Sequence, residues 1–193
     1  MFERLKEERL TGDPAKLVVG LLAQDRRLLV QAQSALVEAF GDVSIKSPEM
    51  PFSFTNYYEK EMGPGLIRQW VTFLGQVEPE QLYDFKLKSG QLEKRFRGPD
   101  GRRRVNLDPG LLSLYNLVLA STKSFAHRVY LREGIYAELT LMFQAGKFQS
   151  LAWTYPDYQT PVCQEFLSHC RKELLADIAR QRTGGNDRLA PAS

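Results

Sequence analysis

The sequence predicts a single α/β domain of the α+β kind, with a mixed, largely antiparallel sheet and two or three helices packed mainly on one face. Three observations predict it. An apolar run at residues 17–23 precedes a helical repeat, strand-like segments separated by turns occupy residues 105–151, and a second helical repeat follows Pro161. The 193 residues suffice for one core, and no low-complexity linker divides them.

The first predicted unit is a β-α-β arrangement over residues 16–47. The continuous apolar run Leu17–Ala23 is typical of a strand buried on both faces. Asp25 suits the N-cap of the following helix, and Gly41 suits its C-terminal stop. A short alternating strand follows at residues 43–45. This pattern does not distinguish a parallel unit from a split one.

The middle of the chain predicts one strand and one helix. Residues 66–77 are rich in Trp, Val, Thr and Phe, which favour a strand. Pro79 suits the first turn of a helix that carries Leu82 and Phe85. Residues 98–101, Gly-Pro-Asp-Gly, predict a turn after this helix.

The second half predicts mainly strands. One short strand, 105–107, should end at a turn over Asp108-Pro109-Gly110, and another should cover residues 117–120. Three further segments predict an antiparallel meander: 126–131, 135–143 and 148–151. In the middle segment the odd-numbered residues from Ile135 to Phe143 should share one face.

A closing helix should begin with Thr160 as N-cap and Pro161 at its first position, and end at Gly184-Gly185. The chain then divides into a charged lead-in at 1–14, one globular domain at 15–183, and a tail at 184–193 that we expect to be disordered.

Net charge, cysteine spacing and the length of the apolar runs limit the partners and the location that can be expected. The net charge of +3 is too small to argue by itself for a nucleic acid or membrane partner. Cys163 and Cys170 lie seven residues apart on one predicted helix, about 10 Å, which is too far for a disulfide and favours a reducing compartment. No apolar run approaches the ~20 residues of a membrane span. We therefore expect a cytoplasmic protein without a membrane association.

The common catalytic motifs are absent from the sequence. There is no Gly-x4-Gly-Lys-Ser/Thr phosphate loop, no Gly-x-Gly-x-x-Gly, no Gly-x-Ser-x-Gly and no His-Glu-x-x-His. His169 and Cys170 are adjacent on one helix and do not readily face one ion, so a structural zinc site is not expected. The cofactor stays unassigned, with a divalent metal ion as a candidate.

Polar residues at the ends of predicted strands suggest a ligand pocket built from residues 106–138 and 54–63. Three of them could transfer a proton or hold a divalent ion: Asp108, His127 and Glu138. Five more could bind a nucleotide or a phosphorylated metabolite: Tyr58, Glu61, Asn106, Lys123 and Arg128. The structural alternative is a turn cap, solvated charges and a hydrogen-bonded histidine.

Each of two aromatic segments has two alternative interpretations. Residues 52–58 could line a pocket for a base or a cation, or form a satellite core under a loop. Residues 153–158 could form a lid or a packed connection before the last helix.

Two non-enzymatic functions compete with the pocket. Residues 86–104 carry eight basic and two acidic side chains, and could bind RNA or another polyanion through Arg102, Arg103 and Arg104. An assembly subunit would instead expose a contiguous apolar patch. Whether the protein is an enzyme, and what its oligomeric state is, stay open from the sequence.

The chain also resembles an uncharacterised bacterial and archaeal domain-of-unknown-function family, some members of which are labelled GTP-binding proteins. The resemblance covers roughly Lys16 to Phe166. It depends on six blocks of sequence: 16–22, 52–63, 104–110, 117–123 with 126–128, 134–138 and 153–158. The chain has neither a phosphate loop nor an Asn-Lys-x-Asp guanine reader, so the label finds no support in its residues. The resemblance implies that residues 106–138 contain the site.

Overall fold

The computed structural model describes residues 13–55 and 57–186 of the chain. The strands are β1 (Lys16–Ala23), β2 (Val43–Lys46), β3 (Met50–Pro51), β4 (Ile67–Phe73), β5 (Val105–Leu112), β6 (Asn116–Ser121), β7 (Arg128–Arg132), β8 (Ile135–Gln144) and β9 (Lys147–Ser150). The helices are α1 (Arg26–Phe40), α2 (Glu59–Met62), α3 (Leu82–Arg95) and α4 (Pro161–Asn186), with 3-10 turns η2 (Pro79–Gln81) and η3 (Pro156–Gln159).

All these strands belong to one sheet with the order β2-β4-β1-β5-β6-β8-β7, in which β3 also pairs with β4 and β9 also pairs with β8. Every pairing between the described strands is antiparallel. The predicted α+β fold with a largely antiparallel sheet is confirmed. Since β4 lies between β1 and β2, these two strands run parallel without touching, and the β-α-β unit is the split kind.

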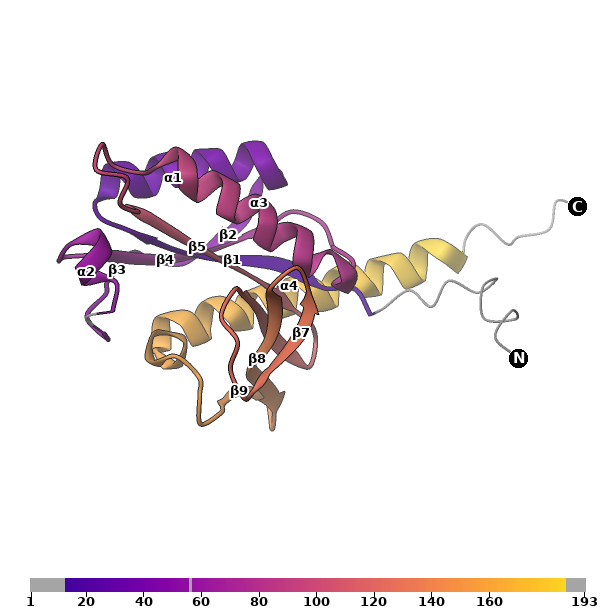
Figure 1. Ribbon diagram of the computed structural model, residues 1–193. Helices are drawn as coiled ribbons and strands as arrows, with labels where there is room; N and C mark the ends of the chain where they lie inside the picture. Colours follow the sequence, from indigo (N-terminus) through magenta and orange to yellow (C-terminus); the bar gives the residue numbers. More distant parts are fainter. Residues whose placement is uncertain (1–12, 56, 187–193) are drawn as a thin grey trace, which may run out of the picture.

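Helices cover both faces of the sheet (Figure 1): α1 and α3 lie on one face and α4 crosses the other. Strand β1 is buried at every position. Leu17 and Val19 pack in the cluster that contains α1, whereas Val18 packs in the cluster that contains Phe166 of α4. The expectation of helices mainly on one face holds for α1 and α3, and α4 is the exception. A strand that is apolar on both faces requires cover on both.

Helix α4 begins as predicted and ends later. The Thr160 hydroxyl accepts a hydrogen bond from the Cys163 N–H at 3.3 Å, which is the N-cap contact. The predicted stop at Gly184-Gly185 is wrong, because the helix continues to Asn186. The lead-in up to residue 12 and the tail from residue 187 lie outside the described residues. Within the described ranges, no helix combines the length and apolar character of a membrane span.

The antiparallel meander β7-β8-β9 is confirmed. Its first turn, Glu133-Gly134, has φ values of 49° and 74°, and its second, Ala145-Gly146, has φ values of 51° and 80°. Left-handed backbone at both turn positions is typical of two-residue hairpins.

The face assignment within β8 is wrong. Leu117 pairs with Leu141 while the next residue, Val118, pairs with Leu139, so Thr140 forms a bulge. Ile135 and Leu141 consequently pack in different clusters. One extra residue moves all later side chains to the opposite face.

Candidate functional site

The site begins where the sheet opens between β5 and β6. β1 pairs with the whole of β5, but β6 pairs only with Gly110, Leu111 and Leu112. The predicted turn at 108–110 is therefore wrong, because the backbone continues through it as strand. Pro109 has no N–H to donate to a neighbouring strand, and the β5–β6 ladder ends beside it.

Side chains of α3 take the place of β6 beside the open part of β5. The Leu107 N–H donates a hydrogen bond to Glu93 Oε1 at 2.7 Å, and the Leu107 carbonyl accepts one from Lys86 Nζ at 3.4 Å. Burial raises the pKa of Glu93, although the Lys86 ammonium and the Leu107 N–H oppose the shift. The backbone of an opened strand is thus satisfied without closing the gap.

A cavity of about 570 Å³ occupies this gap. Its walls come from β5, β6 and α3, together with side chains from residues 52–55, 57–58, 122–128 and 155–158. Seven aromatic side chains line it: Phe52, Phe54, Tyr57, Tyr58, Phe125, Tyr155 and Tyr158. Nine charged side chains line it as well: Arg68, Lys86, Glu93, Arg103, Asp108, Lys123, Arg128, Glu138 and Asp157. A cavity of this volume with aromatic and polar walls can hold a small molecule.

Arg68 of β4 lies buried in one wall of the cavity. Its Nη2 lies 2.9 Å from Asp157 Oδ2, and its Nη1 lies 3.4 Å from Asp108 Oδ2. Its guanidinium lies 5.3 Å from the ring centroid of Tyr158. A Cβ at Gly20 of β1 would lie 3.0 Å from Arg68 Nη2 and 2.8 Å from Tyr158 Oη. Glycine at position 20 leaves the space that these side chains occupy.

Asp108 of β5 contacts three polar side chains, those of Arg68, Lys86 and Asn106. Its Oδ1 lies 3.8 Å from Lys86 Nζ, and its Oδ2 accepts a hydrogen bond from Asn106 Nδ2 at 2.6 Å. Burial acts to raise the pKa of Asp108, but Lys86, Arg68 and the Asn106 amide outweigh it and hold this pKa below its usual value. The Asp108 charge in turn raises the pKa of Tyr58 far above that of an ordinary phenol, and burial adds to the effect.

Glu138 and Arg128 form a second polar centre. Arg128 Nε donates a hydrogen bond to Glu138 Oε2, and His127 Nε2 lies 3.2 Å from the same oxygen. Arg128 Nη1 donates to the Lys123 carbonyl at 2.8 Å, and Nη2 donates to Tyr155 Oη at 2.7 Å. Each nitrogen of the Arg128 guanidinium has a protein partner, so Arg128 positions the other groups.

Three polar atoms around the cavity are buried and have no hydrogen-bond partner among the described residues: Arg68 Nε, Glu138 Oε1 and Tyr158 Oη. Tyr155 lies near three carboxylates of the cavity, Glu138, Asp108 and Asp157. Burial, and then the charge of Glu138, raise the pKa of Tyr155 to about 12. Unpartnered buried polar atoms are rare in folded proteins, and three of the six found among the described residues belong to side chains that line this one cavity.

Lys123 lies at the edge of the cavity. Its Nζ donates a hydrogen bond to Tyr57 Oη at 2.5 Å and lies 3.9 Å from the centre of that ring. Within the described chain it forms no ion pair with a carboxylate, unlike the other cations that line the cavity. Lys123 is therefore the cation available to an anionic ligand.

Six of the predicted site residues line one cavity: Tyr58, Asn106, Asp108, Lys123, Arg128 and Glu138. The other two lie just behind its wall. His127 contacts Glu138 and stacks on Trp153, with ring centroids 4.8 Å apart. Glu61 accepts a hydrogen bond at 2.8 Å from Arg103, which lines the cavity.

The sequence interpretation missed Arg68, Lys86 and Asp157 as pocket residues. Arg68 carried a usable signal, because it is the one charged residue of the strand β4. In the sequence Lys86 belongs to the basic strip and Asp157 to the aromatic loop, so their convergence on Asp108 and Arg68 depends on tertiary structure. Both aromatic segments, around residues 52–58 and 153–158, contribute to the cavity wall.

The basic strip is divided between the cavity wall and the exposed surface, where the Arg102 side chain is 67% exposed. Lys86 and Arg103 line the cavity. Each of the three arginines pairs with an acid: Arg102 with Asp100 at 3.5 Å, Arg103 with Glu61 at 2.8 Å, and Arg104 with Asp25 at 3.7 Å.

Residues 13–55 and 57–186 contain no group of three or more His, Cys, Asp or Glu side chains that could hold a metal ion. Asp108, Asp157 and Glu138 pair with arginines instead.

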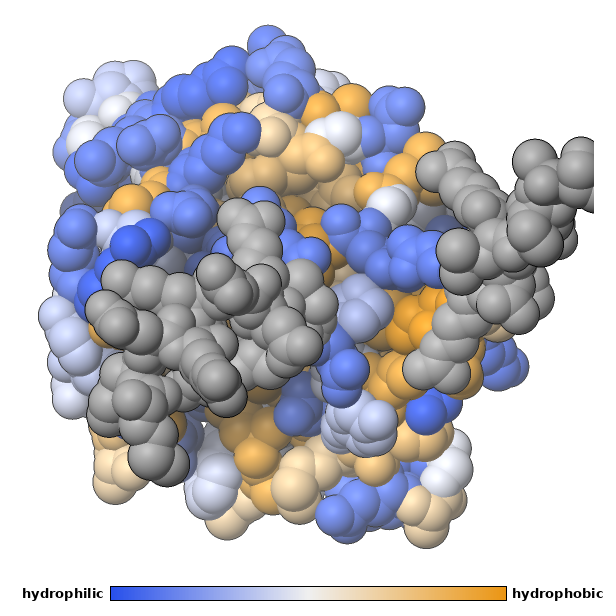
Figure 2. Space-filling view, turned by 90° about the vertical axis from the view of Figure 1, so that its right-hand side faces the viewer, coloured by the Kyte–Doolittle hydropathy of each residue, from blue (hydrophilic) through white to orange (hydrophobic). Residues whose placement is uncertain are grey.

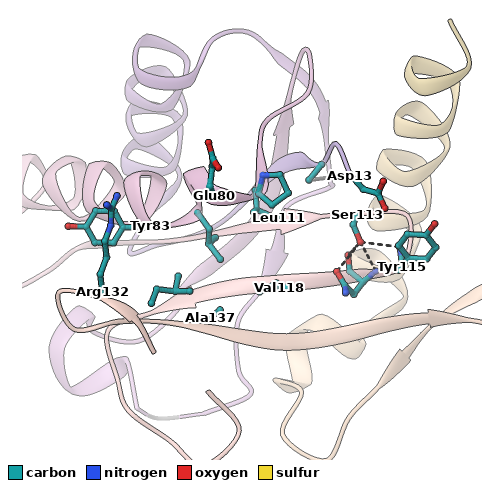
Figure 3. Close-up of a pocket in the computed structure, with 14 residues that line it drawn as sticks. Asp13, Glu80, Tyr83, Leu111, Ser113, Tyr115, Val118, Arg132 and Ala137 are labelled. Carbon is teal, nitrogen blue, oxygen red and sulfur yellow. Dashed lines mark hydrogen bonds between the residues drawn. The ribbon is translucent and has the colours of Figure 1, made fainter. Parts of the chain in front are cut away.

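A second cavity, of about 510 Å³, lies between the start of α3 and strands β5, β6 and β8 (Figure 3). Leu111, Val118 and Ala137 are among the apolar side chains on its walls. At one end Ser113 Oγ donates to Asn116 Oδ1 at 2.9 Å. None of the unpartnered buried polar atoms found in the described residues belongs to this second cavity, so the β5–β6 cavity is the stronger candidate.

Apolar side chains are also exposed outside the cavities. On the edge strand β7, Val129 is 69% exposed and Tyr130 is 57% exposed. The face in Figure 2 shows apolar patches interrupted by hydrophilic residues where the described surface is visible. This pattern does not single out an assembly surface.

Comparison with known proteins gives a family and no activity. A search of curated proteins and a search of solved structures each found no match. The profile of one family, described as "Domain of unknown function (DUF4416)", matches residues 13–174, which include every residue that lines the β5–β6 cavity. The chain therefore belongs to the DUF4416 family.

Proposed function

We propose that the protein binds a small phosphorylated ligand in the cavity between β5 and β6. The observation that carries this proposal is the set of three buried polar atoms without partners, Arg68 Nε, Glu138 Oε1 and Tyr158 Oη, around an aromatic cavity. Each such atom costs about 1–3 kcal/mol when it stays unsatisfied. A polar ligand that completes their hydrogen bonds recovers this energy.

Lys123 supports an anionic group on the ligand. It has no carboxylate partner among the described residues, and the neighbouring Ser121 and Thr122 also line the cavity. An ammonium group with nearby hydroxyls is a common phosphate-binding combination. We assign Lys123 to the phosphate and the inner cavity to the remainder of the ligand.

A cytoplasmic location fits this proposal. Cys163 and Cys170 are both free and buried on α4, as expected for a protein from a reducing compartment. Phosphorylated metabolites are abundant in the same compartment.

Thermal denaturation and calorimetric titration with inorganic phosphate, ribose 5-phosphate and nucleoside monophosphates test the proposal. A ligand at 100 times its Kd stabilises the native state by about 2.7 kcal/mol, which raises the Tm by roughly 5–10 °C for a chain of this size. Lys123→Ala should weaken binding about tenfold or more. Lys147→Ala, an exposed lysine on β9, is the matched control.

Thr122→Trp adds bulk at an exposed position that lines the cavity, and should abolish binding while the protein stays folded. The proposal is wrong if no phosphorylated compound raises the Tm. It is also wrong if the rise is the same in Thr122→Trp and in Lys123→Ala as in the wild type.

A further inference from the structure

We infer that the ligand is a nucleotide, whose base donates an N–H hydrogen bond to Glu138 Oε1. The inference rests on the proposed function, because the phosphate is assigned to Lys123. It depends on three features of the cavity: a free acceptor, a charge that is already balanced, and exposed aromatic rings.

The free acceptor is Glu138 Oε1. The Glu138 side chain is 1% exposed and lines the cavity. Its Oε2 is occupied by Arg128 and His127, whereas Oε1 has no partner among the described residues. A carboxylate oxygen only accepts hydrogen bonds, so the ligand atom opposite Oε1 must be a donor.

The charge balance favours a neutral donor. Arg128, whose side chain is 6% exposed, already compensates the charge of Glu138 inside the protein. A ligand ammonium group would add a second buried cation against the same carboxylate, and burying an unpaired charge is costly. A neutral N–H completes the hydrogen bond of Oε1 without adding charge. The charge balance therefore favours a ligand with a neutral base over a ligand with a charged amine.

The aromatic rings favour a planar ligand. Phe125, Tyr57 and Tyr155 line the cavity and are 66%, 56% and 40% exposed, so part of each ring is accessible to a ligand. Two of these rings are held in place: Lys123 donates to Tyr57 Oη, and Arg128 donates to Tyr155 Oη. Stacking between a base and fixed aromatic side chains is tolerant of base identity.

One guanidinium joins the two ends of the proposed site. Arg128 Nη1 holds the backbone carbonyl of Lys123, and Arg128 Nε holds the Glu138 carboxylate. The backbone of the phosphate-binding lysine and the base-binding carboxylate are therefore linked through one side chain, which suits a ligand that carries both a phosphate and a base.

Calorimetric titration of the four ribonucleoside monophosphates and of ribose 5-phosphate tests the inference. The wild-type protein should bind the best nucleotide at least about tenfold more tightly than ribose 5-phosphate, which has the same phosphate and sugar but no base. In Glu138→Gln the amide oxygen can face Arg128, which turns the NH₂ group toward the base. This variant should lose the preference for nucleotides over ribose 5-phosphate.

Glu165→Gln, an exposed position on α4, is the control and should keep the wild-type preference. If Glu138→Gln does not fold, the wild-type protein is titrated instead with an N-methylated form of the best base that lacks the N–H. We expect at least tenfold weaker binding for that compound. The inference is wrong if ribose 5-phosphate and nucleotides bind equally well, or if Glu138→Gln keeps the full preference for nucleotides. Either result would still be consistent with a phosphate-binding pocket. Failure of every phosphorylated compound overturns both.

Discussion

Arg128 of β7 and Glu138 of β8 lie directly opposite each other on adjacent antiparallel strands, and the Arg128 Nε donates to Glu138 Oε2. Their side chains are 6% and 1% exposed. Cross-strand neighbours of opposite charge stabilise a sheet modestly at its surface. This pair is buried in a cavity wall, so losing one partner is much more costly than losing an exposed pair.

Arg128→Ala should destabilise the protein by about 3–5 kcal/mol, because it leaves the Glu138 carboxylate buried without its guanidinium. Urea unfolding at neutral pH measures the change. Arg132→Ala is the matched control on the same strand, since Arg132 pairs with Asp84 at the surface, where the side chains are 60% and 64% exposed. That variant should change stability by less than about 1 kcal/mol. Similar losses in the two variants would contradict the prediction.

Gly110→Ala should destabilise the protein by about 1–3 kcal/mol, because β5 and β6 approach too closely there for a side chain. An added Cβ would lie 2.5 Å from Leu119 Cδ2 and 2.8 Å from the Val118 carbonyl oxygen. Gly90→Ala is the comparison: nothing lies within 4 Å of its Cβ position in α3, and the change should stabilise by up to about 1 kcal/mol. Thermal and urea unfolding measure both. If Gly110→Ala leaves the free energy of unfolding unchanged, β5 and β6 can move apart at this position without a loss of stability.

Asp108→Asn should cost about 1–3 kcal/mol at pH 7, because Lys86 and Arg68 lose a charged partner. The pKa of Asp108 is lower in the folded protein than its usual value, so the carboxylate stabilises the fold above the unfolded pKa, near 4. This contribution is lost as the pH falls through the folded pKa. The difference between variant and wild type should be constant from pH 8 to pH 5 and narrow below about pH 4. Urea unfolding of both proteins across this pH range measures the difference in free energy of unfolding. A difference that already narrows between pH 7 and 5 would contradict the prediction.

Tyr155 should remain un-ionised at pH values where an ordinary tyrosine, with a pKa near 10, has titrated. Burial and the nearby Glu138 raise its pKa to about 12. The difference in phenolate absorbance between the wild type and Tyr155→Phe should therefore be small at pH 10.5 and grow only toward pH 12. A difference signal with its midpoint near pH 10 would show that Tyr155 is not enclosed by the cavity wall.

The elements with strong local signals were predictable from sequence. The apolar run at 17–23, the Asp25 cap and the turn residues Gly134 and Gly146 each specify their structure through neighbours in the chain. The order of the strands depends on contacts far apart in sequence, such as the insertion of β4 between β1 and β2. Periodicity carries no information on that order.

The prediction of Asp108-Pro109-Gly110 as a turn failed for an instructive reason. Those residue types favour turns, but Pro109 and Gly110 here end a strand pairing and permit close contact with Leu119. Most of the predicted site residues between 106 and 138 do line one cavity. The reason is that the β5–β6 pairing stops at Gly110 and leaves a gap between the two strands. Arg68 stands out as the one charged residue of β4, but its convergence with Asp108 was not predictable, since β4 reaches β5 only through the intervening strand β1.

The side chains that hold Leu107 make its backbone amide a reporter on helix α3. In an ordinary sheet the exchange of such an amide with solvent would follow the separation of two strands. Here the N–H is bound by the Glu93 carboxylate and the C=O by the Lys86 ammonium. Exchange at this one amide should therefore follow the docking of α3 against the sheet, independently of the β1–β5 ladder on its other side.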